Sequence, residues 1–179
     1  RSIIADPRSP TMQKKINMKI KFREGFRPFA PAILNEKSSE FFVNNNNNPY
    51  MLIITQLKDE LKKNTEKLII TEGFKKLNVL RSDIQAVTHV DYSARVQSVF
   101  RDTNKKFYLL INKFYEKTGC PILVNTSFNV NNEPIVCTVK DAYNCFKKTD
   151  LDYLVCGNFL IKKTNWSLFL LKSAQPLFH

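Results

Sequence analysis

Glycine is scarce in this sequence of 179 residues. The four glycines, Gly25, Gly73, Gly119 and Gly157, lie tens of residues apart. A phosphate-binding loop of the Walker or dinucleotide type needs several glycines within a few residues, because its backbone approaches the phosphates closely. The sequence excludes both loop types. If the protein binds a nucleotide, side chains must supply more of the phosphate contacts than backbone amides do.

Histidine and paired cysteines are also lacking. The only histidines are His89 and His179, and no C-x-x-C pair occurs among the four cysteines. A structural zinc site needs closely spaced Cys and His residues, so we assign no metal ligands. Each cysteine has apolar neighbours, which is typical of buried, reduced thiols. This usage predicts a cytoplasmic protein without a disulfide framework.

Long apolar runs are missing as well. No run approaches the roughly 20 residues that a membrane helix needs, and no basic-then-apolar segment at the N-terminus indicates a signal peptide. With 43% hydrophobic residues and 14 phenylalanines, the chain can bury a core, which excludes a disordered basic tail. The length fits one domain. Because the chain opens on Arg1, we expect it to be a piece of a longer protein.

Negative charge is in short supply. The chain has 28 Lys and Arg against 16 Asp and Glu, which gives a formal charge of +12 and a pI near 9.6. Such a balance favours polyanionic partners, and a nucleic-acid-binding module is one interpretation. The lysines are nevertheless scattered over residues 58–83, 104–117 and 162–172, and no RNA-recognition signature occurs. Nucleic acid is therefore an alternative partner that the sequence does not favour.

The apolar pattern predicts an α/β domain. We expect helices at 12–20, at 103–118 with Gly119 ending the helix, and after Thr138 as N-cap through 148. Strands are expected at 49–57, 86–90, 94–99, 122–128, 133–137 and 151–163. Residues 58–83 are Lys-rich and poorly patterned, and we interpret them as a solvated loop or hairpin insertion. Because strands and helices alternate, a mixed sheet flanked by helices is predicted.

The first cluster with chemical potential comprises Lys21, Arg23 and Arg27. These cations lie within seven residues and are bracketed by Phe22, Phe26, Phe29 and two prolines. Lysine offers a point charge to phosphate and arginine offers a planar fork. Fixing such side chains beside aromatic residues would build a preorganised anion site. The alternative is a solvated basic strand.

The second cluster is THVDYSARV, in which His89, Asp91, Ser93 and Arg95 alternate with other residues. Alternation places the four on one face of a strand or its turn. A lone histidine is more often structural than catalytic, so Arg95 is the better candidate for an anion ligand.

The third cluster is NTSFN, which follows a buried strand and contains Asn125, Thr126, Ser127 and Asn129. Ligands of α/β sheets bind at such strand ends, where hydroxyl and amide groups can hold a phosphate, a ribose or a carbonyl oxygen. The alternative is an ordinary polar turn.

Taken in order, six motifs resemble the C-terminal domain of the O-carbamoyltransferase family, which includes nodulation-factor and antibiotic carbamoyltransferases. The motifs are RSIIADPR, KFREGFRPFAPAIL, NPYM, AVTHVDYSARVQSV, PILVNTSFNVNNEPIV and DYLVCGNFL. The resemblance implies a YrdC-like domain with a twisted mixed sheet at residues 1–163. Residues 164–179 form a tail outside it, in which 166–171 would pack against a preceding domain. That N-terminal domain, which is actin- or sugar-kinase-like, would be absent from this chain.

The family resemblance implies a function for this domain. It would bind ATP and carbamoyl phosphate and form carbamoyl-adenylate, with Mg²⁺ beside the phosphates. The N-terminal domain, which holds an iron in this family, would then transfer the carbamoyl group to a hydroxyl acceptor. Lys21 and Arg95 are the expected catalytic residues. The expected ligands of carbamoyl phosphate and ATP are Arg1, Lys21, Arg23, Arg27, Arg95, Asn125, Ser127 and Asn129.

Three positions depart from the family pattern. Tyr92 stands where the family usually has glycine, Asn131-Asn132 stand where it has Arg-Gly, and Gly25 replaces a common proline. Losing the arginine removes one contact to ATP, so a non-catalytic docking domain is a further alternative. Asn132 can still adopt the left-handed conformation that glycine favours. The leading hypothesis is that the three clusters fold into a single positively charged pocket for two anionic substrates.

Overall fold

A mixed four-stranded sheet forms the centre of the computed structural model, which describes residues 1–43, 47–163 and 168–171. The strands are β1 (Ser2–Ala5), β6 (Ile122–Ser127), β2 (Ala30–Leu34) and β5 (Gln97–Val99), in this spatial order. β6 is antiparallel to both of its neighbours, whereas β2 and β5 are parallel. This sheet confirms the predicted mixed α/β architecture. The sequence patterns had not predicted β1 or β2.

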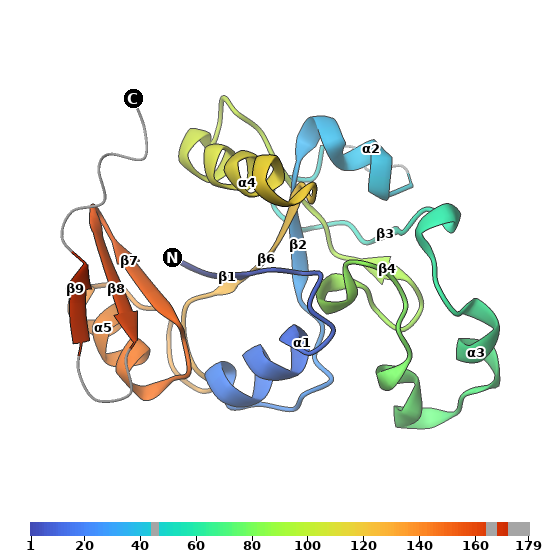
Figure 1. Cartoon of the computed structure of the whole chain (residues 1–179), viewed down its shortest axis with the longest axis horizontal. Coiled ribbons are helices and arrows are strands. Elements are labelled where there is room, and N and C mark those ends of the chain that lie inside the picture. The colour runs from blue at the N-terminus through green and yellow to red at the C-terminus, as the bar shows by residue number, and fades with distance from the viewer. Residues whose placement is uncertain (44–46, 164–167, 172–179) are drawn as a thin grey trace.

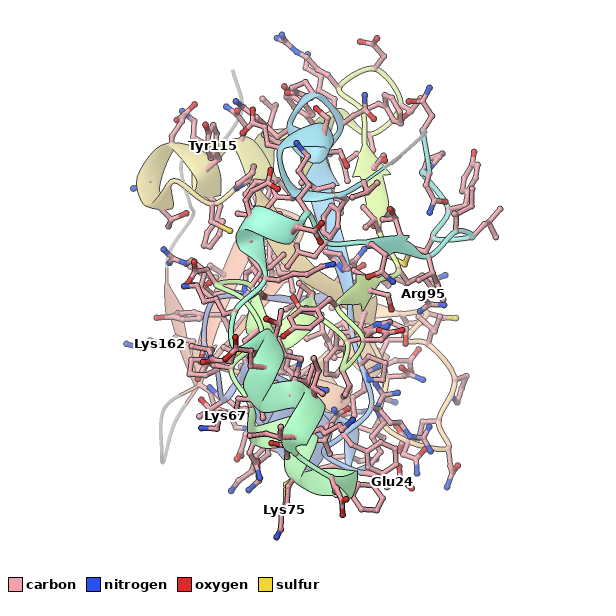
Figure 2. The ribbon with its side chains drawn as sticks, turned by 90° about the vertical axis from the view of Figure 1, so that its right-hand side faces the viewer. Glu24, Lys67, Lys75, Arg95, Tyr115 and Lys162 are labelled. Atoms are coloured by element: carbon pink, nitrogen blue, oxygen red, sulfur yellow. The ribbon has the colours of Figure 1, made fainter. Side chains whose placement is uncertain are left out.

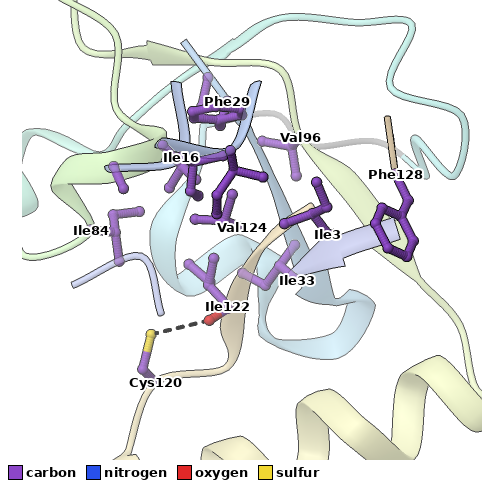
Figure 3. Packing of buried hydrophobic residues seen from close by; sticks show 14 of the residues in the cluster. Ile3, Ile16, Phe29, Ile33, Ile84, Val96, Cys120, Ile122, Val124 and Phe128 are labelled. Carbon is purple, nitrogen blue, oxygen red and sulfur yellow. Dashed lines mark hydrogen bonds between the residues drawn. The ribbon is translucent and has the colours of Figure 1, made fainter. Parts of the chain in front are cut away.

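Apolar side chains alternate between the two faces of this sheet, as the period of a strand requires. On one face Ile33, Ile122 and Val124 pack with Ile16 and Ile20, which follow the helix α1 (Met12–Lys15). Figure 3 shows this part of the core, with Ile3, Ile16, Ile33 and Val124 side by side. On the other face Ala32, Leu34, Val99 and Leu123 pack against Ile111 of α4 (Lys105–Thr118). Figure 1 accordingly shows α4 and α1 on opposite sides of the strands.

The two longer helices match their sequence signals. α4 begins after Asn104, whose side chain accepts a hydrogen bond from the backbone N–H of Phe107, and it ends at Gly119 with φ of 71°. α5 (Val139–Lys148) begins with a capping box between Thr138 and Asp141. Ala142, Cys145 and Phe146 of α5 are buried, as its pattern predicted. Both boundaries depend on local chemistry, which is why the sequence predicts them.

The C-terminal part is a separate antiparallel sheet, drawn in orange and red in Figure 1. The predicted single strand at 151–163 is a hairpin of β7 (Tyr153–Cys156) and β8 (Phe159–Lys163), because Gly157 turns the chain with φ of 57°. β9 (Leu168–Leu171) pairs with β8. The packing of 166–171 against a preceding domain stays a prediction. Residues 166–167 of this segment lie outside the described residues.

The insertion at 58–83 is helical rather than a solvated loop or hairpin. It contains η3 (Asp59–Leu61), α3 (Thr65–Ile70) and η4 (Gly73–Asn78), where η1 to η5 denote 3₁₀ or π turns. These elements bury Leu68, Val79 and Arg81. Short helices of this kind depend on tertiary contacts for their stability, so the poor local pattern did not reveal them.

Three predicted strands are mostly absent from the described residues. In 49–57 only β3 (Thr55–Gln56) is a strand, and it pairs with β4 (Ser93–Ala94). The segment at 86–90 contains the turn η5 (Gln85–Val87) instead, and 133–137 forms a loop. Within 94–99 the chain leaves β4 at Ala94 and joins the main sheet as β5. These short segments satisfy their backbone groups in turns and side-chain contacts.

Two compositional expectations can be compared with the fold. All four cysteines are free; Cys120 and Cys145 are buried, but Cys137 is exposed, which corrects the prediction of four buried thiols. Among the described helices, none has the length and apolar character needed to cross a membrane.

Candidate functional site

The sheet brings the three sequence clusters to one of its ends. Ser2 lies opposite Ser127, Ala30 opposite Asn125, and Ala32 opposite Gln97. The end of β6 therefore lies beside the starts of β1, β2 and β5, which follow Arg1, Phe29 and Val96. Arg1 and Arg95 precede opposite edge strands, however. Three interstrand spacings separate these edges by roughly 14 Å, so one small anion does not span them.

Lys21 and the NTSFN cluster form the best-defined polar centre. Lys21 ends the π-helical turn η1 (Ile16–Lys21) and is only 3% exposed. Its Nζ donates to Ser127 Oγ at 3.1 Å and to Asn129 Oδ1 at 2.6 Å, and also to the carbonyl oxygen of Ser127. The structure therefore brings Lys21 together with Ser127 and Asn129, which lie more than 100 residues later in the sequence.

The turn after Lys21 explains how its side chain is buried. Phe22 has φ of 50°, in the left-handed region that a bulky residue rarely adopts. This conformation ends η1, so that the chain reverses while Lys21 points inward. Phe22 and Phe26 are exposed, so of the three aromatic residues expected to anchor this segment only Phe29 is buried.

The electrostatics of Lys21 favour an incoming anion. Burial, and secondarily the nearby charge of Arg23, lower the pKa of Lys21 to about 8. In the described part of the chain its ammonium has oxygen acceptors but no carboxylate within 4.0 Å. Its positive charge is held by neutral oxygens and is not neutralised by an acid. Because all three ammonium hydrogens are donated to these oxygens, an anion that binds here directly would replace one of them.

Arg23 is held in place by a residue that the sequence analysis did not select. Asn17, which is fully buried, accepts a hydrogen bond from Arg23 Nε at 2.7 Å. The Asn17 amide also donates to the carbonyl of Arg27 at 2.8 Å. In addition, the Arg23 guanidinium stacks over Phe29, with 5.1 Å between Cζ and the ring centroid. Asn17 is therefore the internal support of the basic segment, and only its place in an amphipathic pattern hinted at burial.

The other two predicted arginines near this end are more exposed. Arg27 Nε pairs with Glu24 at 2.8 Å, so its charge is partly compensated. Arg95 makes no hydrogen bond or ion pair with the rest of the described chain and is exposed. Figure 2 shows Arg95 and Glu24 on the same side of the molecule. Neither arginine contacts Lys21 directly, so the predicted single pocket is only partly formed.

Arg1 and Asn125 line a different space, a cavity of about 900 Å³ between the sheet, α4 and the β7–β8 hairpin. Arg1 Nη1 lies 3.4 Å from Cys137 Sγ. Asn125 is 8% exposed, and its Nδ2 donates to Gln97 Oε1 at 2.7 Å. Asn125 Oδ1 is buried and has no hydrogen-bond partner among the described residues. Such an acceptor requires an N–H or O–H donor, which a ligand bound in the cavity could supply to Asn125.

Gln97 is a second residue that the sequence analysis missed. It lines the same cavity. From β5 it accepts a hydrogen bond from the amide of Asn125 on β6, across the strand β2 that lies between them. The only sequence signal for Gln97 was its position near Arg95 in a predicted strand. Within the described ranges no group of three or more His, Cys, Asp or Glu residues is placed to hold a metal ion.

The chain is similar to known proteins over most of its length. The family model for the carbamoyltransferase C-terminus matches residues 1–163. An uncharacterized protein of Synechocystis sp. is 51% identical over 92% of this chain and 27% of its own length. Nodulation protein NolNO of Sinorhizobium fredii is 45% identical over 91% of this chain and 22% of its own length.

A relative with a named reaction is more distant. The 3'-hydroxymethylcephem-O-carbamoyltransferase of Amycolatopsis lactamdurans is 29% identical over 88% of this chain and 26% of its own length. The chain thus spans about a quarter of the length of these relatives. Since the family model covers nearly all described residues, the chain belongs to the carbamoyltransferase C-terminus family.

Proposed function

We propose that this chain is the adenylating part of an O-carbamoyltransferase. It would bind ATP and carbamoyl phosphate and produce carbamoyl-adenylate, from which the carbamoyl group passes to a hydroxyl acceptor. The observation that carries the proposal is the buried Lys21 ammonium, held by Ser127 and Asn129 at the sheet end where Arg23 is fixed by Asn17. A YrdC-like fold, with which the mixed sheet is compatible, is part of the same proposal.

The chemistry requires water as well as the two substrates. Water attacks carbamoyl phosphate, the bond to its phosphate breaks, and carbamate and inorganic phosphate result. A carbamate oxygen then forms a bond to the α-phosphorus of ATP, and the bond to pyrophosphate breaks. Both steps place anions against each other, so fixed cations that offset their repulsion are the main requirement.

The named residues have distinct tasks in this scheme. Lys21, backed by Ser127 and Asn129, would hold the carbamoyl phosphate or carbamate oxygens. Arg23, Arg27 and Arg95 would hold phosphate oxygens, and the Arg27 pair with Glu24 would have to open for this. The 900 Å³ cavity is large enough for a nucleotide, and the unpartnered Asn125 Oδ1 fits an N–H donor such as an amino group of a base.

Two further participants belong to the proposal. Mg²⁺ would neutralise charge on the ATP phosphates. Because such an ion usually takes few protein ligands and several phosphate or water oxygens, the residues described are compatible with it. The second participant is an N-terminal catalytic domain, which holds an iron in the family and transfers the carbamoyl group to the acceptor. Ile69, Ile70 and Phe74 form an exposed apolar group that such a domain could cover.

Pyrophosphate exchange tests the proposal directly. The 179-residue chain should incorporate labelled pyrophosphate into ATP only when carbamoyl phosphate is present. Arg95→Ala should abolish the exchange, whereas Arg101→Ala, at an exposed turn beyond the other end of β5, should not change it. If the wild-type chain shows no exchange, the adenylating role is wrong. If Arg95→Ala exchanges normally, Arg95 does not belong to the site.

A nucleic-acid module remains the second candidate because of the +12 charge. Several lysines are paired with acids on their own surface, for example Lys62 with Asp59 at 2.6 Å and Lys113 with Glu116 at 2.7 Å. Such pairing weakens a continuous basic surface. Salt-sensitive RNA binding that survives in Lys21→Ala and Arg95→Ala variants, and that is tighter than the roughly 10⁻⁴–10⁻⁶ M of general charge attraction, would favour this candidate.

A further inference from the structure

A second cavity lies next to the basic segment but is lined by other residues than those of the candidate site. It has a volume of about 500 Å³ and lies between Phe26 and Pro28, the helices of the insertion and the turn at 88–91. None of the eight site residues predicted from the sequence lines it. Its walls are largely apolar, and its polar lining includes Arg81, His89, Asp91 and Lys76.

Arg81 is the most unusual of these residues because its charge is buried without an acid. It is 1% exposed, yet no carboxylate in the described chain lies within 4.0 Å of its guanidinium. Nε donates to the carbonyl of Thr88 at 3.1 Å, and Nη1 donates to the carbonyls of Lys76, Leu77 and Val79. Nη2 makes no hydrogen bond with the described residues. Backbone oxygens therefore fix the guanidinium, and one of its amino groups is left for a ligand.

His89 presents a defined acceptor to the same cavity. Asp91 Oδ1 lies 2.6 Å from Ser93 Oγ, and because a carboxylate only accepts, the single hydroxyl proton of Ser93 points to Asp91. Ser93 Oγ must then accept from His89 Nδ1, which lies 3.0 Å away. Burial lowers the pKa of His89, so its ring is neutral near pH 7. The proton is on Nδ1, and Nε2 is an unprotonated acceptor.

These groups have complementary requirements. Arg81 and Lys76 are positive and Asp91 is negative, so one positive charge among the lining side chains is not compensated. The open guanidinium edge suits an oxyanion, and His89 Nε2 suits a hydroxyl hydrogen. The apolar wall, made by Phe26, Leu68, Ile69, Leu77 and Val90, suits a hydrocarbon skeleton.

We propose that this cavity is a binding site for a small hydroxylated organic oxyanion, with Arg81 holding the charge and His89 Nε2 accepting the hydroxyl hydrogen. The Asp91–Ser93–His89 chain sets the tautomer and is thus a positioning element. The site requires neither ATP nor carbamoyl phosphate, so it does not depend on the function proposed above.

Binding of matched probes to the 179-residue chain tests the proposal. The probes are 2-hydroxy-4-methylpentanoate, its analogue 4-methylpentanoate without the hydroxyl, and inorganic phosphate. One additional hydrogen bond predicts that the hydroxy acid binds about three- to tenfold more tightly than the analogue. Phosphate that competes with both acids would identify a general oxyanion site, whereas phosphate that does not compete would restrict the ligand to carboxylates.

Variants then separate the two contacts. His89→Phe should remove the preference for the hydroxy acid and leave the analogue bound, and Arg81→Met should weaken both acids. Lys21→Met should change neither, which distinguishes this cavity from the candidate site. Because Arg81→Met could unfold the insertion, the tautomer is also measured in the wild type from the ¹⁵N shifts of His89. A proton found on Nε2, no binding of either acid, or no effect of His89→Phe would overturn the proposal.

Discussion

Two residues of this protein, Lys21 and Arg81, carry a buried positive charge that no acidic side chain of the described chain neutralises. Lys21 is 3% exposed and Arg81 is 1% exposed, and both are held by neutral oxygens. Burying a charge costs free energy unless hydrogen bonds replace its hydration. Both side chains have these hydrogen bonds, so each keeps its positive charge at a fixed place. The two residues differ in one respect: Lys21 can lose its proton, whereas Arg81 remains charged.

The pKa of Lys21 predicts how anion binding depends on pH. Its folded-state pKa is lowered from 10.5 to about 8, so the ammonium loses its proton as the pH rises through about 8. If only the charged form binds, the affinity for sulfate should be constant below this pH and fall by up to tenfold per unit above it. Sulfate is the suitable probe because it does not titrate in this range.

The control for this prediction is Lys21→Arg, which remains charged throughout and should show no decline above pH 8. The same shift increases the free energy of unfolding between about pH 8 and 10.5, since the unfolded chain there still binds the proton that the folded chain has released. An affinity that is flat to pH 9.5 in the wild type would contradict the assigned pKa or the role of Lys21.

At the scale of elements, the segment between η1 and β2 depends on a few polar supports. It carries Arg23 and Arg27 but buries little of its own side-chain area, since Phe22 and Phe26 are exposed. Its carbonyls are held by Asn17 from inside and by Gln13 from the more exposed side. The geometry of the basic cluster is therefore controlled from the helix that precedes it.

Replacing Asn17 should damage the segment far more than replacing Gln13. Asn17→Ala leaves Arg23 Nε and the carbonyl of Gly25 without their side-chain partner, and removes one of the two donors to the carbonyl of Arg27, which we expect to cost about 1–3 kcal/mol. Gln13→Ala removes two similar bonds where water can replace them, and should cost less than about 1 kcal/mol. Denaturant unfolding measures both changes, and sulfate binding should weaken only in Asn17→Ala. Equal losses would show that Asn17 has no special supporting role.

The contact between α5 and β8 allows two neighbouring lysines of one strand, Lys163 and Lys162, to be compared. Lys163 Nζ donates to the carbonyls of Phe146 at 3.0 Å and Lys147 at 3.2 Å, and also to that of Thr149, at the end of α5. A cation there satisfies free carbonyls and the helix dipole. Lys163→Met should therefore lower the free energy of unfolding by about 1–2 kcal/mol.

Its neighbour is the matched control. Lys162 is exposed and projects from the molecule in Figure 2, so Lys162→Met should change stability by less than about 0.5 kcal/mol. Chemical denaturation with circular dichroism distinguishes the two variants. A loss of equal size in both would mean that general charge, and not the helix end, is responsible.

How far the sequence predicts these elements depends on whether their signals are local. The N-cap at Thr138, Gly119 after α4 and the apolar run of β6 act within a few residues, and all three were predicted. Helices in the insertion are stabilised by contacts with distant residues, so their local pattern is weak. The candidate site divides in the same way. Residue types singled out Lys21, Ser127 and Asn129, whereas Asn17 and Gln97 had only a weak signal in the apolar pattern, and the burial of Arg81 follows from the tertiary structure.

At the scale of the whole molecule, the excess of 12 positive charges is spread over many elements. Lys67 and Lys75 lie on the insertion and Lys162 lies on β8 (Figure 2), so these lysines belong to different elements. A charge that is distributed in this way attracts polyanions without selecting among them. General attraction and the recognition of a small anion at Lys21 should therefore be separable by experiment.

Binding of a single-stranded oligonucleotide provides this separation. We expect a dissociation constant of about 10⁻⁴–10⁻⁶ M at physiological salt, with an affinity that falls steeply and linearly in a plot of log K against log salt, as counterion release requires. Lys21→Met should leave this binding and its slope unchanged, because the buried ammonium cannot reach a backbone phosphate on the surface. The same variant should lose sulfate binding at low salt. If Lys21→Met instead abolishes oligonucleotide binding together with sulfate binding, the two activities share the Lys21 ammonium, and the separation of general attraction from small-anion recognition is wrong.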